Sequence, residues 1–168
     1  QPSALGTAPI QVVKYAHALF EEGDHRKHIQ RSAFEKVYAV FDRDGHDSYH
    51  GALALAASLD GKLRNEARQP VVFQAVASVP CFELWLLLHF EDIPAPLHRE
   101  EVLHRLKRHM PGYDKGAGNA FAVTARHVAT ATQRARRLAA RFTAHTDPEP
   151  FTAVAELVNE LTTLRNAS

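Results

Sequence analysis

The chain has 168 residues, with 20 lysines and arginines, 19 aspartates and glutamates, a formal net charge of +1 and one cysteine. This length allows one domain with a buried core, and the single Cys81 excludes an intramolecular disulfide and a cysteine-rich zinc module. With so little net charge, any affinity for nucleic acid must come from locally clustered basic residues. No apolar run reaches the roughly 18 residues of a transmembrane helix, so we expect a soluble, cytoplasmic protein.

The first 23 residues predict one helix after a short lead-in. Pro9 suits the first turn of a helix, Gly23 suits its end, and apolar residues recur between them at helical spacing. The chain starts with Gln1, not methionine, and lacks the apolar core of a secretory signal. We therefore expect residues of the natural protein to be missing upstream.

A short apolar segment that ends in carboxylates is the most informative stretch of the sequence. Residues 37–41 are apolar, β-branched and aromatic, which is typical of a strand buried on both faces, and Asp42, Asp44 and Asp47 follow. Ligands of open α/β sheets collect at the carboxyl ends of strands, and two carboxylates there suit Mg²⁺ or Mn²⁺. The alternative is a polar turn after a strand, which needs no metal.

A second strand is predicted to join the first in a βαβ unit. Residues 50–68 form an amphipathic helix, because Ala52, Leu55, Ala56, Leu59 and Leu63 repeat at helical spacing. Residues 71–77 form an apolar strand after Pro70. Two strands joined by a helix are parallel, so their carboxyl ends meet at one edge.

The segment after the second strand brings another carboxylate to this edge. Pro80 opens a helix that is apolar almost all round and therefore buried, with Glu83 in its first turn. A buried carboxylate is costly unless it is paired, protonated or bound to a cation. The alternative role of Glu83 is to interact with the positive end of the helix dipole.

The rest of the chain, from residue 92, is predicted to be mostly helical. One helix precedes Pro111, a loop at 113–119 contains Lys115, a long helix covers 122–144, and a last helix follows Pro150. We expect five residues of the last helix to face inward: Val154, Leu157, Val158, Leu161 and Leu164.

Basic residues in this half are candidates for phosphate contacts. Lys115 lies in a glycine-punctuated loop of a kind that often carries function. The helix at 122–144 has a basic stripe of four arginines opposite its apolar face: Arg126, Arg134, Arg137 and Arg141. Such a stripe can follow a phosphate backbone, or it can be an ordinary solvated helix face.

Other site classes find no support in the sequence. The pairs His25/His28 and His46/His50 have helical spacing, but neither has a third zinc ligand or an H-E-x-x-H arrangement. No G-x-S-x-G, glycine-rich phosphate loop or dinucleotide fingerprint is present. Hydrolase triads and nucleotide cradles are therefore unsupported.

Two motifs resemble those of the RloB-like family of bacterial proteins. They are Val40-Phe41-Asp42-Arg43-Asp44 and Ser78-x-Pro80-Cys81-Phe82-Glu83-x-Trp85-Leu86-Leu87-Leu88-His89-Phe90. The loop at 113–116 also matches, as does Asp147-Pro148 followed by Thr152 to Leu161, so the resemblance covers most of the chain from Lys36 onward.

The resemblance implies a fold and an activity. The family is associated with restriction-linked and abortive-infection phage defence and is placed with TOPRIM-type nucleases, whose α/β domain uses a D-x-D pair and an upstream glutamate. By position, Asp42 and Asp44 are the implied Mg²⁺ ligands, and Glu83 and Lys115 match family-typical positions. Two departures stand out: Val79 replaces an expected asparagine, and no strand ending in glutamate precedes the first helix.

The expected fold is therefore TOPRIM/Rossmann-like α/β: a single domain over residues 1–168, with a small, mostly parallel sheet flanked by helices. The leading hypothesis is a Mg²⁺- or Mn²⁺-dependent nuclease with Asp42, Asp44 and Glu83 as catalytic residues, and with Lys115 and the four arginines on the nucleic acid. The missing glutamate favours an alternative, a non-enzymatic TOPRIM-like subunit that binds or senses beside a companion ATPase. A third possibility is a structural domain in which Asp42 and Asp44 cap a turn.

Overall fold

The computed structural model describes residues 2–116, 118–146 and 148–167, with side chains up to residue 165. It is a mixed α/β structure with one three-stranded sheet, in the order β1-β2-β3. The chain divides into two compact units. The first unit contains residues 1–41 and 45–76, and the second contains residues 42–44 and 77–168. The expectation of a single domain stays a prediction.

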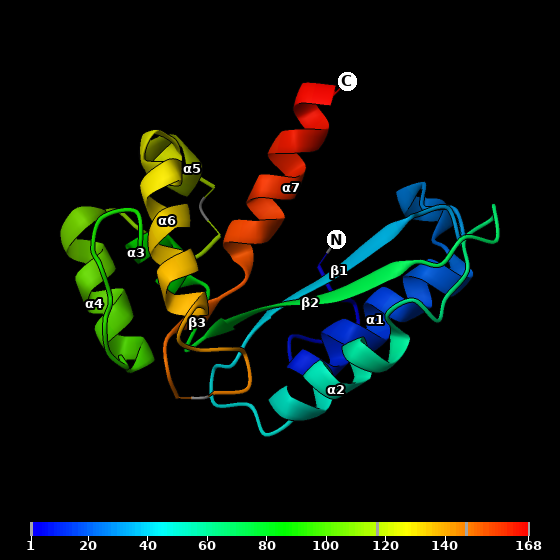
Figure 1. Cartoon of the computed structure of the whole chain (residues 1–168), viewed down its shortest axis with the longest axis horizontal. Helices are drawn as coiled ribbons and strands as arrows, with labels where there is room; N and C mark the ends of the chain where they lie inside the picture. The colour runs from blue at the N-terminus through cyan, green and yellow to red at the C-terminus, as the bar shows by residue number, and fades with distance from the viewer. Residues whose placement is uncertain (1, 117, 147, 168) are drawn as a thin grey trace. The chain divides into compact units, whose positions relative to one another are not determined.

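Two helices and most of two strands make up the first unit. The helices α1 (Pro9–Glu22) and α2 (Tyr49–Leu59) pack against each other, as Figure 1 shows in blue and teal. The predicted bounds of α1 are confirmed: Pro9 opens it, and Gly23 caps it with φ +73°. A short 3₁₀ turn, His25–Lys27, follows.

The helix α2 is shorter than the sequence predicts. It ends at Leu59, not near residue 68, because the next residues make other hydrogen bonds. Asp60 Oδ1 accepts a hydrogen bond from the backbone N–H of Phe73 at 3.0 Å, and Gly61 N–H donates to Val71 O at 2.9 Å. Contacts with the following strand therefore end the helix, although its apolar periodicity continues.

The strands β1 (Lys36–Asp42) and β2 (Val72–Val79) are neighbours in the sheet. Val72 N–H donates to Glu35 O at 3.0 Å, and Arg43 N–H donates to Ser78 O at 2.9 Å. The residue numbers of both partners rise from the first pair to the second, so the two strands run in the same direction. The strands are therefore parallel, and the predicted βαβ unit is confirmed.

The expectation that β1 is buried on both faces is wrong. Ala39 and Phe41 are buried, whereas Val40 between them is 44% exposed. The side chains of β1 thus alternate, because successive residues of a strand point to opposite faces. Phe41 packs edge-on against Tyr49 of α2, with ring centroids 6.0 Å apart.

The second unit carries a third strand and most of the remaining helices. The strand β3 (Phe151–Thr152) pairs antiparallel with β2, and Ser78 Oγ lies 2.9 Å from Thr152 Oγ1. The sheet thus has one parallel and one antiparallel pair, so the expectation of a mostly parallel sheet holds only for β1 and β2. The short helix α3 (Glu83–Leu87) is fully buried, as predicted, and follows a cis Val79–Pro80 peptide bond.

Four more helices follow in the second unit. They are α4 (Arg99–His109), α5 (Ala120–Thr124), α6 (Val128–Ala139) and α7 (Val154–Ala167). The helix α3 contacts α4 and α6, and α6 also contacts α7 (Figure 1). The core between these helices is aliphatic and includes Leu84, Leu87, Leu88, Ile93, Val102, Leu106, Ala131, Ala135 and Leu138.

Two helix predictions in this unit are wrong in part. The helix predicted at 122–144 is divided, because a 3₁₀ turn (Ala125–His127) separates α5 from α6, and α6 ends at Ala139. In α7, Val154 is buried, but Leu161 and Leu164 are each 55% exposed. The apolar stripe of α7 therefore extends past the region where the helix packs. Among the described residues, no helix is both long and apolar enough to cross a membrane.

Candidate functional site

The acidic end of β1 is joined to the end of β2 by backbone hydrogen bonds within the second unit. Arg43 N–H donates to Ser78 O at 2.9 Å, and Asp44 N–H donates to Pro80 O at 3.0 Å. Asp44 has φ +38°, a left-handed conformation that aspartate tolerates better than most residues. These bonds fix Asp42 and Asp44 beside the segment that leads to Glu83.

Asp44 is not a free carboxylate, because Arg99 of α4 forms a hydrogen-bonded ion pair with its Oδ1. The side chains of Asp44 and Arg99 are 19% and 37% exposed, so the pair is partly shielded from water. Burial acts to lower the pKa of Arg99, but the charges of Asp44 and Glu83 outweigh it and raise this pKa. No sequence pattern predicts this pair, since the two residues lie on separate segments.

Glu83 is the most deeply buried charged group of the site, with 1% of its side chain exposed. Tyr113 Oη donates a hydrogen bond to Glu83 Oε1 at 3.1 Å, and Lys115 Nζ lies 3.9 Å from the same oxygen. The other oxygen, Oε2, is buried and has no hydrogen-bond partner among the described residues. Among the described residues, no hydrogen bond therefore offsets the cost of burying Glu83 Oε2.

Two neutral groups border Glu83. Burial and the Glu83 carboxylate raise the pKa of the Cys81 thiol to about 12, and the same two causes raise the pKa of Tyr113 above its usual range. Both groups are therefore protonated at neutral pH. Tyr113 acts as a hydrogen-bond donor, and Cys81 is unsuited to the role of a thiolate nucleophile.

Asp42 is affected by the charges of two other carboxylates. Burial is the largest cause that raises the pKa of Asp42, and the charges of Asp44 and Glu83 raise it further. The charge of Lys115 and a hydrogen bond from the Phe82 backbone act in the opposite direction. Asp44 and Glu83 thus both lie within electrostatic range of Asp42. Arg99 is the cation beside Asp44, and Lys115 is the cation beside Glu83.

The donor atoms of this site suit a hard divalent cation. Asp42 and Asp44 supply carboxylate oxygens, and Mg²⁺ often takes only one or two carboxylates from a protein and keeps several waters. The buried Glu83 Oε2 is a further oxygen without a partner. However, the described part of the chain contains no group of three or more His, Cys, Asp or Glu side chains arranged to hold a metal ion.

The helix α4, which carries Arg99, is attached to the segment after α3 by a second polar cluster. Glu91 Oε2 accepts from Arg105 Nε at 2.8 Å, and Glu91 Oε1 lies 2.8 Å from His109 Nε2. Burial acts to raise the pKa of Glu91, but hydrogen bonds from His109 and Arg105 outweigh it and lower this pKa. This cluster, which sequence patterns did not reveal, holds the helix of Arg99 in position.

The four arginines of the predicted basic stripe make contacts within the protein. Arg134 Nη1 donates to Leu88 O at 2.8 Å, and Arg137 Nη2 contacts Asp92 Oδ2 at 3.1 Å. Arg141 Nη1 lies 3.5 Å from Pro94 O, and Arg126 Nε lies 3.1 Å from His127 Nε2. Three of these arginines thus contact the segment at 88–94, and the contact of all four with nucleic acid stays a prediction. Lys115, in contrast, is 62% exposed.

Comparison with known proteins assigns the family. The sequence model described as RloB-like protein matches residues 1–161. The chain belongs to the RloB-like family. Neither the curated proteins nor the solved structures compared with it gave a match. The RloB-like match spans both units, and within it lie Asp42, Asp44, Glu83, Arg99, Tyr113 and Lys115.

Proposed function

We propose that this RloB-like protein is a Mg²⁺-dependent nuclease that hydrolyses phosphodiesters of DNA or RNA. The observation that carries the proposal is the position of Glu83: a buried carboxylate with an unpartnered oxygen lies within electrostatic range of Asp42. Buried charges without partners are costly, and they concentrate at functional sites. A cation bound at this site would compensate all three carboxylates.

Each residue has a role under this proposal. Asp42 and Asp44 would hold Mg²⁺ or Mn²⁺, and Glu83 would orient a metal-bound water through Oε2. The ion supplies Lewis acidity toward the phosphate oxygen and lowers the pKa of a bound water. Tyr113 fixes the Glu83 carboxylate by its hydrogen bond, and the exposed Lys115 attracts the phosphate backbone.

The proposal extends to the fold and to the wider biological setting. A TOPRIM-like fold, a cytoplasmic location and a role in abortive infection or phage defence fit a nuclease that carries this site. The parallel pair β1 and β2, with acidic residues after β1, supports the fold part of the proposal. The four arginines of the basic stripe remain candidates for contacts with the nucleic-acid backbone. To make such contacts they would have to give up the protein contacts described above: Arg126, Arg134, Arg137 and Arg141.

A cleavage assay tests the proposal. The wild-type protein is incubated with single- and double-stranded DNA and RNA in Mg²⁺ or Mn²⁺, beside Asp42→Asn and a control, Asp47→Asn. Asp47 is exposed and lies outside the site. We expect Asp42→Asn to lower cleavage at least a hundredfold, because it removes a charged ligand, and Asp47→Asn to keep it. Equal cleavage by wild type and Asp42→Asn would overturn the assignment.

The second candidate is a non-enzymatic subunit that binds nucleic acid or a nucleotide beside a companion ATPase. Two observations favour it: Asp44 is already paired with Arg99, and the described residues offer no three-ligand metal cluster. In that case the protein would bind an oligonucleotide by fluorescence anisotropy without Mn²⁺ dependence and would leave it intact. Mn²⁺-dependent cleavage that Asp42→Asn abolishes would exclude this candidate.

A further inference from the structure

Two basic side chains face the three carboxylates of the site, and they are held differently. Arg99 makes a direct hydrogen-bonded ion pair with Asp44. Lys115 Nζ stays 3.9 Å from Glu83 and has a 62% exposed side chain. Of the two cations, Arg99 is thus the one that occupies a carboxylate oxygen of the D-x-D pair.

A guanidinium and a divalent cation compete for such an oxygen. Both are attracted to the same carboxylate charge, and a cation bound to Asp44 would also repel the guanidinium beside it. We propose that Arg99 is the resident counter-ion of Asp44, that a divalent cation displaces it, and that the released guanidinium then binds the substrate phosphate. This inference rests on the proposed function, because it assumes that Asp42 and Asp44 bind the cation.

The placement of Arg99 allows this exchange. Its backbone begins α4, which is fixed by the buried Val102 and Leu106 and by the contact between Arg105 and Glu91. Its side chain is long and 37% exposed, so the guanidinium can move while the helix stays in place. Because the helix holds the side chain at the site, a guanidinium that leaves Asp44 remains within reach of a phosphate bound there.

The chemistry of arginine fits the second half of the proposal. The planar guanidinium binds a phosphate through two parallel hydrogen bonds, which a lysine ammonium cannot do. The Arg99 side chain would therefore neutralise Asp44 before the divalent cation binds and the substrate phosphate after it binds. This arrangement makes cation binding and phosphate binding mutually favourable, since each requires Arg99 to leave Asp44.

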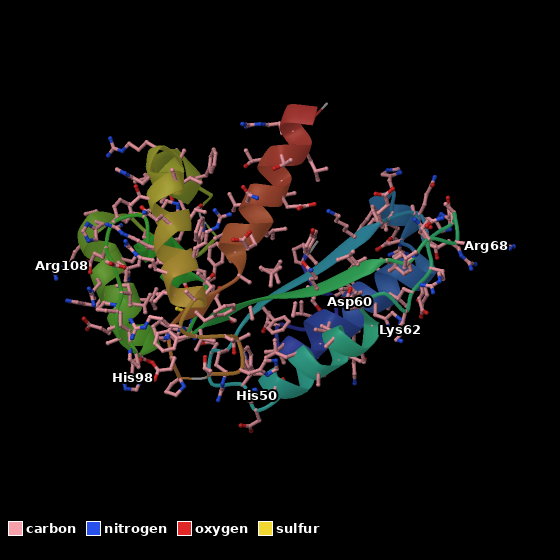
Figure 2. The ribbon with its side chains drawn as sticks, in the orientation of Figure 1. His50, Asp60, Lys62, Arg68, His98 and Arg108 are labelled. Carbon is pink, nitrogen blue, oxygen red and sulfur yellow. The ribbon has the colours of Figure 1, made fainter. Side chains whose placement is uncertain are left out.

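The first measurement is Mn²⁺ affinity by isothermal titration calorimetry on the full-length protein. The variants are Arg99→Gln, Asp44→Asn and, as a matched control on the same helix, Arg108→Gln. Figure 2 shows Arg108 on α4, directed away from the ribbon. We expect Arg99→Gln to bind Mn²⁺ roughly 3–10 times more tightly than wild type. Arg108→Gln should be unchanged, and Asp44→Asn should bind at least tenfold more weakly.

The second measurement is the affinity for a fluorescent single-stranded oligonucleotide by anisotropy at 4 °C, with gels to verify that it stays intact. With saturating Mn²⁺, Arg99→Gln should bind the oligonucleotide about tenfold more weakly than wild type, because a phosphate contact is lost. Without Mn²⁺ the two should bind equally. Arg99→Lys, which keeps the charge but not the planar fork, should show near-wild-type Mn²⁺ affinity and reduced oligonucleotide affinity.

The outcomes separate this proposal from the one on which it rests. If Asp44→Asn weakens Mn²⁺ binding but Arg99→Gln does not strengthen it, Arg99 is only a structural partner of Asp44 and the exchange is overturned, while the metal site stands. If Asp44→Asn binds Mn²⁺ as wild type does, the metal site itself is wrong. If wild type binds no Mn²⁺ and Arg99→Gln does, Arg99 blocks the cation and is not displaced by it, so the exchange is overturned while the metal site stands. If neither binds, both proposals fail.

Discussion

At the scale of the residue, Asp42 shows how a candidate site opposes the stability of the fold. It is partly buried and has two further carboxylates near it, so its ionised form is disfavoured in the folded protein. The nearby Lys115 and the Phe82 backbone offset only part of this effect. A residue that costs stability and has suitable chemistry is one that function accounts for better than folding does.

We expect Asp42→Asn to stabilise the protein in the absence of divalent cations. The folded-state pKa of Asp42 lies above its unfolded value, so the unfolded chain releases this proton more readily and ionisation favours unfolding. The advantage of the variant is therefore absent at low pH and grows as the pH rises through the raised pKa. A small increase in Tm at pH 7, on the order of 1–2 °C, is expected.

Thermal unfolding in a chelator between pH 3 and 8 measures this effect. Asp47→Asn, at an exposed position, is the control and should leave the pH profile unchanged. A lower Tm for Asp42→Asn at neutral pH would show that the ionised carboxylate is stabilised by its neighbours, contrary to the direction argued here.

At the scale of the elements, the arginines of α6 join this helix to the segment that follows α3. Arg134 donates to Leu88 O, Arg137 contacts Asp92, and Arg141 lies near Pro94 O. The basic side of the helix is thus turned toward carbonyl and carboxylate oxygens of the same unit. Sequence periodicity found the stripe, but only the packing of α6 and α3 decided what it touches.

We expect Arg134→Gln to destabilise the protein by about 1–2 kcal/mol, because the hydrogen bond from a charged, partly buried donor to Leu88 O is lost. Arg126→Gln is the control, since Arg126 is exposed and its side chain contacts the neighbouring His127; it should change stability by less than about 0.5 kcal/mol. Urea unfolding measures both. Unchanged stability together with weaker oligonucleotide binding would instead place Arg134 on the nucleic acid.

At the scale of the whole molecule, the low net charge limits how nucleic acid is bound. The formal charge of +1 provides little long-range attraction, and three of the stripe arginines already contact protein oxygens. Binding should therefore depend on the few cations that the site exposes, mainly Lys115 and a released Arg99.

The salt dependence of oligonucleotide binding measures how many phosphates the protein contacts. Each phosphate neutralised on a single strand contributes roughly −0.7 to the slope of log K against log salt, so two contacts predict a slope of about −1.4. Lys115→Gln should reduce the slope by about half, whereas Arg108→Gln should not change it. A slope near −4 would show that the four arginines of the stripe also contact phosphates, as the sequence first suggested.

The sequence by itself determined the features that depend on local patterning. The helix α1 with its proline start and glycine end, the βαβ unit, the buried α3 and the convergence of Asp42, Asp44 and Glu83 follow from periodicity, turn chemistry and the geometry of parallel strands. The family resemblance of the two motifs is confirmed by the match to residues 1–161.

Tertiary structure alone decided which side chains meet across long separations in the chain and where periodic patterns stop. The helix α2 ends where Asp60 bonds to Phe73, and the exposed Leu161 continues an apolar stripe beyond the packed part of α7. Arg99 pairs with Asp44 because α4 packs on α3, which no local pattern encodes. Periodicity reports which side of an element is apolar, whereas the partner of each polar group depends on the packing of distant elements.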